Sequence, residues 1–163
     1  MKHVAYIGFG ANLGEREAQC RRALALLDKE PGIRVRVCSP LYLTEPVGME
    51  GAEWFINGAA ALETTLSPED LLNRMLRIEA EMGRDRSQPL SPRTIDLDLL
   101  FYNDRVVQRP GLIIPHPHIQ ERRFVLSPLN SIAADYVHPV LKQTVAQLLD
   151  RCQGDKHVQL LGE

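Results

Sequence analysis

Two acidic residues separated by a single leucine, Asp96 and Asp98, are the side chains of this sequence best suited to chemistry. They lie in an apolar run that predicts a β-strand, in which side chains alternate between the two faces. Both carboxylates then lie on one face, with Cα atoms about 7 Å apart at a rise of roughly 3.3 Å per residue. Aspartate is depleted in strands and like charges repel, so we expect a divalent cation between them.

The surroundings of the two acids in the sequence suggest which cation this is. Oxygen ligands favour magnesium or manganese over zinc, and magnesium is usually held by one or two carboxylates together with substrate phosphates. Arg84, Arg86 and Arg93 are close in the sequence, and guanidinium groups make forked contacts with phosphate. Acids and arginines together predict a metal and polyphosphate site. The alternative is a solvated strand face beside a loop with scattered charges.

Other side chains could bind an organic ligand. His116 lies between two prolines, which stiffen the backbone and would hold its imidazole toward a ligand. Phe124, together with Phe55 and Asn57 from another predicted strand, could stack on a flat heterocycle and hydrogen-bond to it. The alternatives are a surface histidine and aromatic side chains that belong to the core.

Size and composition limit the possible classes of protein. The 163 residues are 44% hydrophobic and 25% charged, which predicts one globular domain covering residues 1–163. The net charge is −2, from 19 basic and 21 acidic side chains, and it predicts neither a nucleic-acid nor a membrane partner. Three widely spaced cysteines indicate reduced thiols, and no signal peptide or membrane span is recognisable. We expect a cytoplasmic monomer.

The predicted elements give an order typical of one architecture. Alternating and helical patterns predict strands at residues 3–10, 33–37, 55–64 and 94–101, and helices at 14–30 and 67–83. This order, strand, helix, strand, strand, helix, strand, is that of the α+β ferredoxin-like βαββαβ core, an antiparallel sheet with helices packed on one face. Loops are expected at residues 39–53 and 84–93, short hairpin strands at 106–107 and 112–114, and extra C-terminal helices at 129–133 and 145–151.

Common nucleotide-binding motifs do not explain the proposed phosphate site. The glycines Gly8, Gly10 and Gly14 follow a predicted strand, but their spacing is one residue longer than the dinucleotide fingerprint. The sequence also contains no Gly-x-x-x-x-Gly-Lys-Ser/Thr loop, so a nucleotide would be held by other means.

The run from Pro92 to Leu100, PRTIDLDLL, resembles the signature of the 6-hydroxymethyl-7,8-dihydropterin pyrophosphokinase family of folate synthesis. Further segments match across most of the chain: Tyr6 to Leu13, Tyr42-x-Thr44-x-Pro46, Phe55-x-Asn57, Glu79 with Gly83-Arg84-x-Arg86, Pro115-His116 and Arg122-x-Phe124. One departure stands out, because Leu90 occupies the position where the family usually carries a tryptophan.

The resemblance implies an enzyme that moves a pyrophosphoryl group from ATP to the pterin hydroxymethyl oxygen and releases AMP. It implies two magnesium ions on Asp96 and Asp98, with Arg84 and Arg93 as further catalytic residues. The residues implied for ATP are Glu79, Arg84, Arg86, Arg93, Leu99, Leu112, Ile113, His116 and Arg122. Those implied for the pterin are Thr44, Val47, Phe55, Asn57 and Phe124.

Three points stay open at the level of the sequence. The hydroxyl proton could pass to Asp98, to water or to a phosphate oxygen. A two-metal phosphohydrolase using Asp96 and Asp98 is an alternative, and it would release inorganic phosphate without a pterin. A ferredoxin-like RNA-binding module is another, although the sequence lacks the Gly-Phe-rich strand motif and the basic sheet face of such modules.

Overall fold

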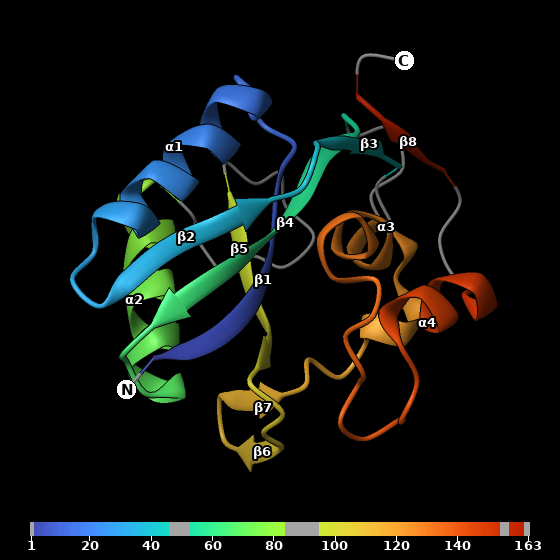
Figure 1. Ribbon diagram of the computed structural model, residues 1–163. Coiled ribbons are helices and arrows are strands. Elements are labelled where there is room, and N and C mark those ends of the chain that lie inside the picture. The colour runs from blue at the N-terminus through green and yellow to red at the C-terminus, as the bar shows by residue number, and fades with distance from the viewer. Residues whose placement is uncertain (1, 46–52, 84–94, 154–156, 162–163) are drawn as a thin grey trace.

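The fold was analysed in a computed structural model that describes residues 2–45, 53–83, 95–153 and 157–161 (Figure 1). Its strands are β1 (His3–Ala11), β2 (Ile33–Cys38), β3 (Tyr42–Thr44), β4 (Phe55–Thr64), β5 (Asp96–Tyr102), β6 (Val107–Arg109), β7 (Leu112–Ile114) and β8 (Val158–Leu160). Its helices are α1 (Arg16–Lys29), α2 (Pro68–Glu81), the short 3-10 helix η1 (Ile119–Glu121), α3 (Arg123–Ala133) and α4 (Val145–Arg151).

The main sheet is antiparallel, with strand order β5-β1-β4-β3-β8, and β2 also pairs with β4. The order β5-β1-β4-β2 within it is that of a ferredoxin-like βαββαβ core, so the expected fold class is confirmed. Figure 1 shows α1 and α2 on one face of the sheet and the C-terminal helices α3 and α4 on the other. Strands β6 and β7 form a separate hairpin.

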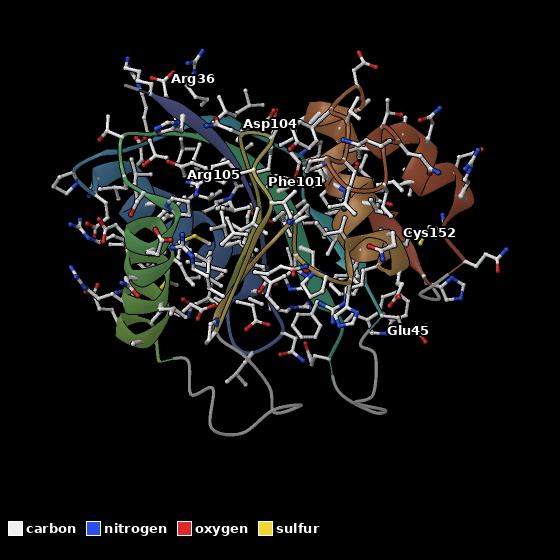
Figure 2. The ribbon with its side chains drawn as sticks, turned by 90° about the horizontal axis from the view of Figure 1, so that it is seen from below. Arg36, Glu45, Phe101, Asp104, Arg105 and Cys152 are labelled. Carbon is white, nitrogen blue, oxygen red and sulfur yellow. The ribbon has the colours of Figure 1, made fainter. Side chains whose placement is uncertain are left out.

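Two hydrophobic clusters hold these layers together. The larger lies under α1 and α2 and includes Ile7, Leu27 and Met75. The smaller joins β4 and β5 to α3 and α4 through residues such as Phe101 and Leu129. Figure 2 shows Phe101 between β5 and α3, on the side of the sheet opposite α1 and α2. Because β4 and β5 are buried on both faces, their sequences are more apolar than a simple alternation predicts.

Helix α2 begins and ends where the sequence predicts. The Ser67 hydroxyl accepts a hydrogen bond from the Asp70 amide at 3.1 Å, and Pro68 occupies the first helical position. The helix stops before Gly83, whose φ of 91° is a conformation that glycine adopts easily. These two ends fix which side chains of α2 face the sheet.

The structure corrects the sequence-based elements in three places. Strand β3 lies within the segment expected to be a loop, and β8 lies in the C-terminal residues that had no assignment. Both are three-residue strands held by pairing with distant segments, β3 to β4 and β8 to β3, so local patterns do not reveal them. Helix α3 begins at Arg123, not near residue 129, because its apolar side chains pack on the sheet despite Pro128.

Within the described ranges, no helix is long and apolar enough to cross a membrane.

Candidate active site

One row of residues crosses four strands on the sheet face opposite α1 and α2. Asp96 of β5 pairs with Gly10 of β1, Gly10 pairs with Asn57 of β4, and Asn57 pairs with Tyr42 of β3. In the adjacent row Asp98 pairs with Gly8. The expected strand geometry of the two aspartates is therefore present, since Leu97 between them is buried in the cluster under α1 and α2. Both aspartates lie beside glycines of β1, so no β1 side chain stands directly opposite either carboxylate.

Gly10 has a geometric reason to be glycine. A Cβ atom added there would lie 1.9 Å from Oδ1 of Asn57 and 3.0 Å from its Cγ, distances that real Cβ atoms do not show. The missing side chain lets the Asn57 amide lie over the backbone of β1. In the sequence, Gly8 and Gly10 stand out as parts of a weak nucleotide motif and of the segment that matches the family. Their closeness to the acids follows only from the strand register.

Three of the residues expected to bind the pterin, Thr44, Phe55 and Asn57, lie next to one another on β3 and β4, and Phe124 lies on the same face of the sheet. The Asn57 Nδ2 donates a hydrogen bond to Oγ1 of Thr44 at 2.5 Å, and both side chains are buried. Phe55 is two residues before Asn57 on β4, so it lies on the same face of the sheet. Phe124, at the start of α3, packs against the smaller cluster on this face, and the Arg122 guanidinium lies 5.7 Å from its ring centre.

The start of β4 is held in place by Arg16, which the sequence did not mark, and by Asn12, which the sequence marked only as part of the family match. Arg16, at the first position of α1, donates a hydrogen bond to the Trp54 carbonyl at 2.5 Å and lies 3.8 Å from the Glu53 carboxylate. The Asn12 amide donates to the Glu53 carbonyl at 3.4 Å. These contacts fix the backbone just before Phe55, and only the nearness of two chain segments 38 to 41 residues apart reveals them.

A pocket of about 260 Å³ lies along the outer edge of β5. Four of the residues implied for ATP line it, together with one of the two acids: Leu99, Leu112, Ile113 and His116 with Asp98. Leu72 and Leu76 of α2 form another part of its wall. In the sequence these two leucines belong to the helical apolar pattern, and only the packing of α2 beside β5 places them at the pocket. The pocket is mostly apolar with an acid at one side, which suits a flat base attached to phosphates.

His116 is held so that one ring nitrogen is free to serve a ligand. Its Nδ1 accepts a hydrogen bond from the His118 amide at 3.4 Å, and its own amide donates to the Leu100 carbonyl at 3.1 Å. Burial, followed by the charges of Arg122 and His118, lowers the pKa of His116 to about 4. The ring is therefore neutral at pH 7, and with Nδ1 accepting, its proton lies on Nε2. This proton can be donated to a phosphate oxygen.

Glu79 lies in a different environment from the other implied ATP residues. Its side chain is 1% exposed, and its carboxylate accepts a hydrogen bond from the Leu97 amide at 2.5 Å. Four other implied residues, Val47, Arg84, Arg86 and Arg93, lie outside the described residues, as does Leu90. The roles of all these residues stay predictions.

The donor set fits magnesium. Asp96 and Asp98 are partly exposed on one face, and Asp98 borders the pocket. In the described part of the chain no group of three or more histidine, cysteine, aspartate or glutamate side chains converges on one point. Such a group is what a closed zinc or calcium site requires, whereas magnesium is often held by two carboxylates with substrate phosphates as the other ligands.

Comparison with known proteins identifies the family of this site. The family model described as 7,8-dihydro-6-hydroxymethylpterin-pyrophosphokinase (HPPK) matches residues 6–134. The chain belongs to this family. The resemblance found in the sequence is thereby confirmed, and so is the expected class of enzyme, a diphosphotransferase.

Individual relatives agree with this assignment. A protein of Bacillus subtilis named 2-amino-4-hydroxy-6-hydroxymethyldihydropteridine pyrophosphokinase is 43% identical over 132 residues, which cover 81% of this chain and 79% of the relative. The folic acid synthesis protein fol1 of Schizosaccharomyces pombe is 44% identical over 148 residues, 91% of this chain, yet the match spans only 20% of that protein.

Solved structures support the fold. The Plasmodium falciparum HPPK-DHPS structure with pteroate superimposes with a TM-score of 0.75 at 16% identity, over 93% of this chain and 42% of that one. At this identity the likeness shows the shared fold alone.

Proposed function

We propose that this enzyme transfers the pyrophosphoryl group of ATP to the hydroxymethyl oxygen of 6-hydroxymethyl-7,8-dihydropterin, with AMP as the second product, in folate synthesis. The observation that carries the proposal is the row Asp96, Gly10, Asn57 and Tyr42, which joins an acidic edge to a buried amide and hydroxyl pair on one face of the sheet. The names of the bacterial relatives, which are matched over about four fifths of their length, support the same substrate.

The reaction balances without a covalent enzyme intermediate. The hydroxymethyl oxygen forms a bond to the β-phosphorus of ATP, the bond from this phosphorus to the oxygen bridging the α-phosphate breaks, and its electron pair leaves with AMP. The hydroxyl proton passes to Asp98, water or a phosphate oxygen. Two magnesium ions held by Asp96 and Asp98 would neutralise triphosphate charge when bound. The remaining task is alignment and charge balance, to which fixed side chains contribute.

The side chains of the chain divide this task between two ligands. Leu99, Leu112 and Ile113 would surround the adenine in the pocket beside β5, while Nε2 of His116 donates to a phosphate oxygen. Arg122 would contact the phosphates, and Glu79 is a further residue that the family likeness implies for ATP. Arg84, Arg86 and Arg93 are proposed as further phosphate contacts, with Arg84 and Arg93 as catalytic residues.

The pterin would lie over β4 and β3. Its amide-like edge would meet Asn57 and Thr44, which already form a buried hydrogen-bonded pair, and its flat ring would stack between Phe55 and Phe124. Val47 would complete the pocket. Rings held this way would direct the hydroxymethyl arm across β1 toward the aspartates, since Asp96 and Asn57 both pair with Gly10 and Asp98 pairs with Gly8.

The test is to identify the nucleotide product. The enzyme is incubated with Mg-ATP with and without the reduced hydroxymethylpterin, and products are followed by ³¹P NMR. AMP formed in equal amount to pterin pyrophosphate, and only when pterin is present, is the expected result. ADP, free phosphate or turnover without pterin would instead indicate the two-metal phosphohydrolase and overturn the proposal.

We further propose that the enzyme works as a cytoplasmic monomer. Light scattering during gel filtration tests this, since a mass of twice 18.4 kDa at assay concentration would contradict it.

A further inference from the structure

Strand β5, which carries both aspartates, lies at the edge of the sheet, and among the described strands it pairs with β1 alone. A backbone N–H that points away from β1 therefore needs another acceptor, because a buried amide without a hydrogen-bond partner is unfavourable. For Leu97 the acceptor is the Glu79 carboxylate of α2, at 2.5 Å. A side chain thus takes the place of a neighbouring strand at the single residue between Asp96 and Asp98.

A carboxylate is a costly side chain for this position. Glu79 is 1% exposed, and its neighbours on the buried face of α2 are Ile78 and Met75. Moving an acid out of water is unfavourable unless its hydrogen bonds compensate, and a leucine there would pack with less desolvation. Compared with leucine, the carboxylate adds an acceptor that gives the Leu97 amide a fixed direction.

That direction matters for the site. The Leu97 amide belongs to the peptide unit that follows Asp96, so rotation of this unit changes the angle between the Asp96 and Asp98 side chains. Glu79 is also four residues before Gly83, and Leu97 is two residues after Ile95. The hydrogen bond therefore connects the described residues on either side of segment 84–94, which contains the three arginines of the proposed phosphate site.

We propose that Glu79 is a positioning residue that aligns the Asp96 and Asp98 carboxylates through the Leu97 amide, a role beyond the ATP contact that the family likeness implies. The inference rests on the proposed function, because it assigns a purpose to the alignment of two metal-holding acids. Partners that orient metal ligands typically contribute 10- to 100-fold to metal affinity or activity. The same range is expected here.

Two substitutions separate alignment from charge and packing. Glu79→Gln keeps an oxygen that can accept from the Leu97 amide, whereas Glu79→Leu keeps the volume and removes the acceptor. Glu81→Leu, on the exposed side of the same helix, is the matched control. The first measurement is hydrogen exchange of the Leu97 amide by NMR in the ligand-free protein, with protection expected in wild type and Glu79→Gln and lost in Glu79→Leu.

The second measurement is Mn²⁺ affinity, by electron paramagnetic resonance, in the presence of a non-hydrolysable ATP analogue. We expect 10- to 100-fold weaker binding for Glu79→Leu, about 3-fold or less for Glu79→Gln, and no change for Glu81→Leu. Pterin affinity without nucleotide should be equal in all of them. Equal losses of Mn²⁺ affinity in Glu79→Gln and Glu79→Leu would show that the charge acts directly, and unchanged Mn²⁺ affinity in Glu79→Leu would show a packing role. Either result overturns the proposal.

Failure of the proposed metal site is distinguishable from failure of this inference. Asp98→Asn should abolish Mn²⁺ binding while the Leu97 amide stays protected. If Asp98→Asn binds Mn²⁺ as wild type does, the metal assignment fails, whatever the Glu79 variants show.

Discussion

Replacing Gly10 by alanine tests the geometry on which the proposed site depends. The added methyl group would lie 1.9 Å from Oδ1 of Asn57, about half of an ordinary contact distance, so one of the two must move. The backbone of β1 is fixed on both sides by pairing with β4 and β5, so the Asn57 side chain is the group that moves. Its movement breaks the hydrogen bond to Thr44 at the centre of the proposed pterin pocket.

The size of the effect follows from burial. Asn57 is 7% and Thr44 2% exposed, so separating them leaves two buried polar groups short of a partner, at a cost of about 1–3 kcal/mol. For a domain of this size each kcal/mol lowers Tm by roughly 2–4 °C. Gly8→Ala is the matched control, because its methyl would lie 3.6 Å from Cδ1 of Leu100, an ordinary contact, on the same strand and face. The loss of glycine flexibility is the same in both variants and cancels in the comparison.

The assay is urea unfolding combined with pterin binding by fluorescence. We expect Gly10→Ala to be about 1–3 kcal/mol less stable than Gly8→Ala and to bind pterin at least 10-fold more weakly than wild type. In a double-mutant cycle, Asn57→Ala should remove most of the stability difference, because the clashing oxygen is gone. Equal stability of the two alanine variants would refute the packing of Asn57 against Gly10, and with it the reason for a glycine there.

Two further predictions concern charge. Asp96→Asn and Asp98→Asn should each reduce kcat by at least about 100-fold, because each removes a proposed metal ligand. Tm should be unchanged or higher, because the two carboxylates repel one another when no ion is bound. Turnover near that of wild type in either variant would contradict the metal pair. Burial lowers the pKa of His138, and that of His116 to about 4, so the folded state favours both neutral rings. Below about pH 6.5 the unfolded chain then binds more protons than the folded chain. The free energy of unfolding should therefore be level above about pH 7 and fall from about pH 6.5 toward pH 5. This fall should be less steep in His116→Gln and in His138→Asn. An unchanged slope in both variants would count against buried neutral histidines.

The sequence predicts best what short-range pattern controls. Alternation around Leu97 places Asp96 and Asp98 on one face, and a serine cap with a following glycine gives the limits of α2. The order of these elements is enough for the core architecture, because few antiparallel arrangements satisfy it. The family signature then indicates the reaction, which pattern and spacing alone leave open between a transferase and a hydrolase.

The features that the sequence misses all depend on contacts between distant segments. Strand β3 forms because β4 offers a partner, and β8 forms because β3 does. The family likeness marks Glu79, but its hydrogen bond to the Leu97 amide becomes visible only when α2 is packed against β5. The fit of Gly10 against Asn57 depends on a register between residues 47 positions apart, which no local rule supplies.

The register also determines where the two proposed ligands can react. Asp96 and Asn57 are both paired with Gly10 in one row, and neighbouring strands are about 4.8 Å apart, so their Cα atoms are about 10 Å apart across β1. The acids at one end of this span would hold the triphosphate and the amide at the other end would hold the pterin, so the transferred group must pass over β1. The Asn57 amide occupies the space beside Gly10 where a Cβ atom would lie. A side chain at residue 10 would therefore displace the amide that is proposed to hold the pterin, so a substitution there should impair catalysis together with pterin affinity.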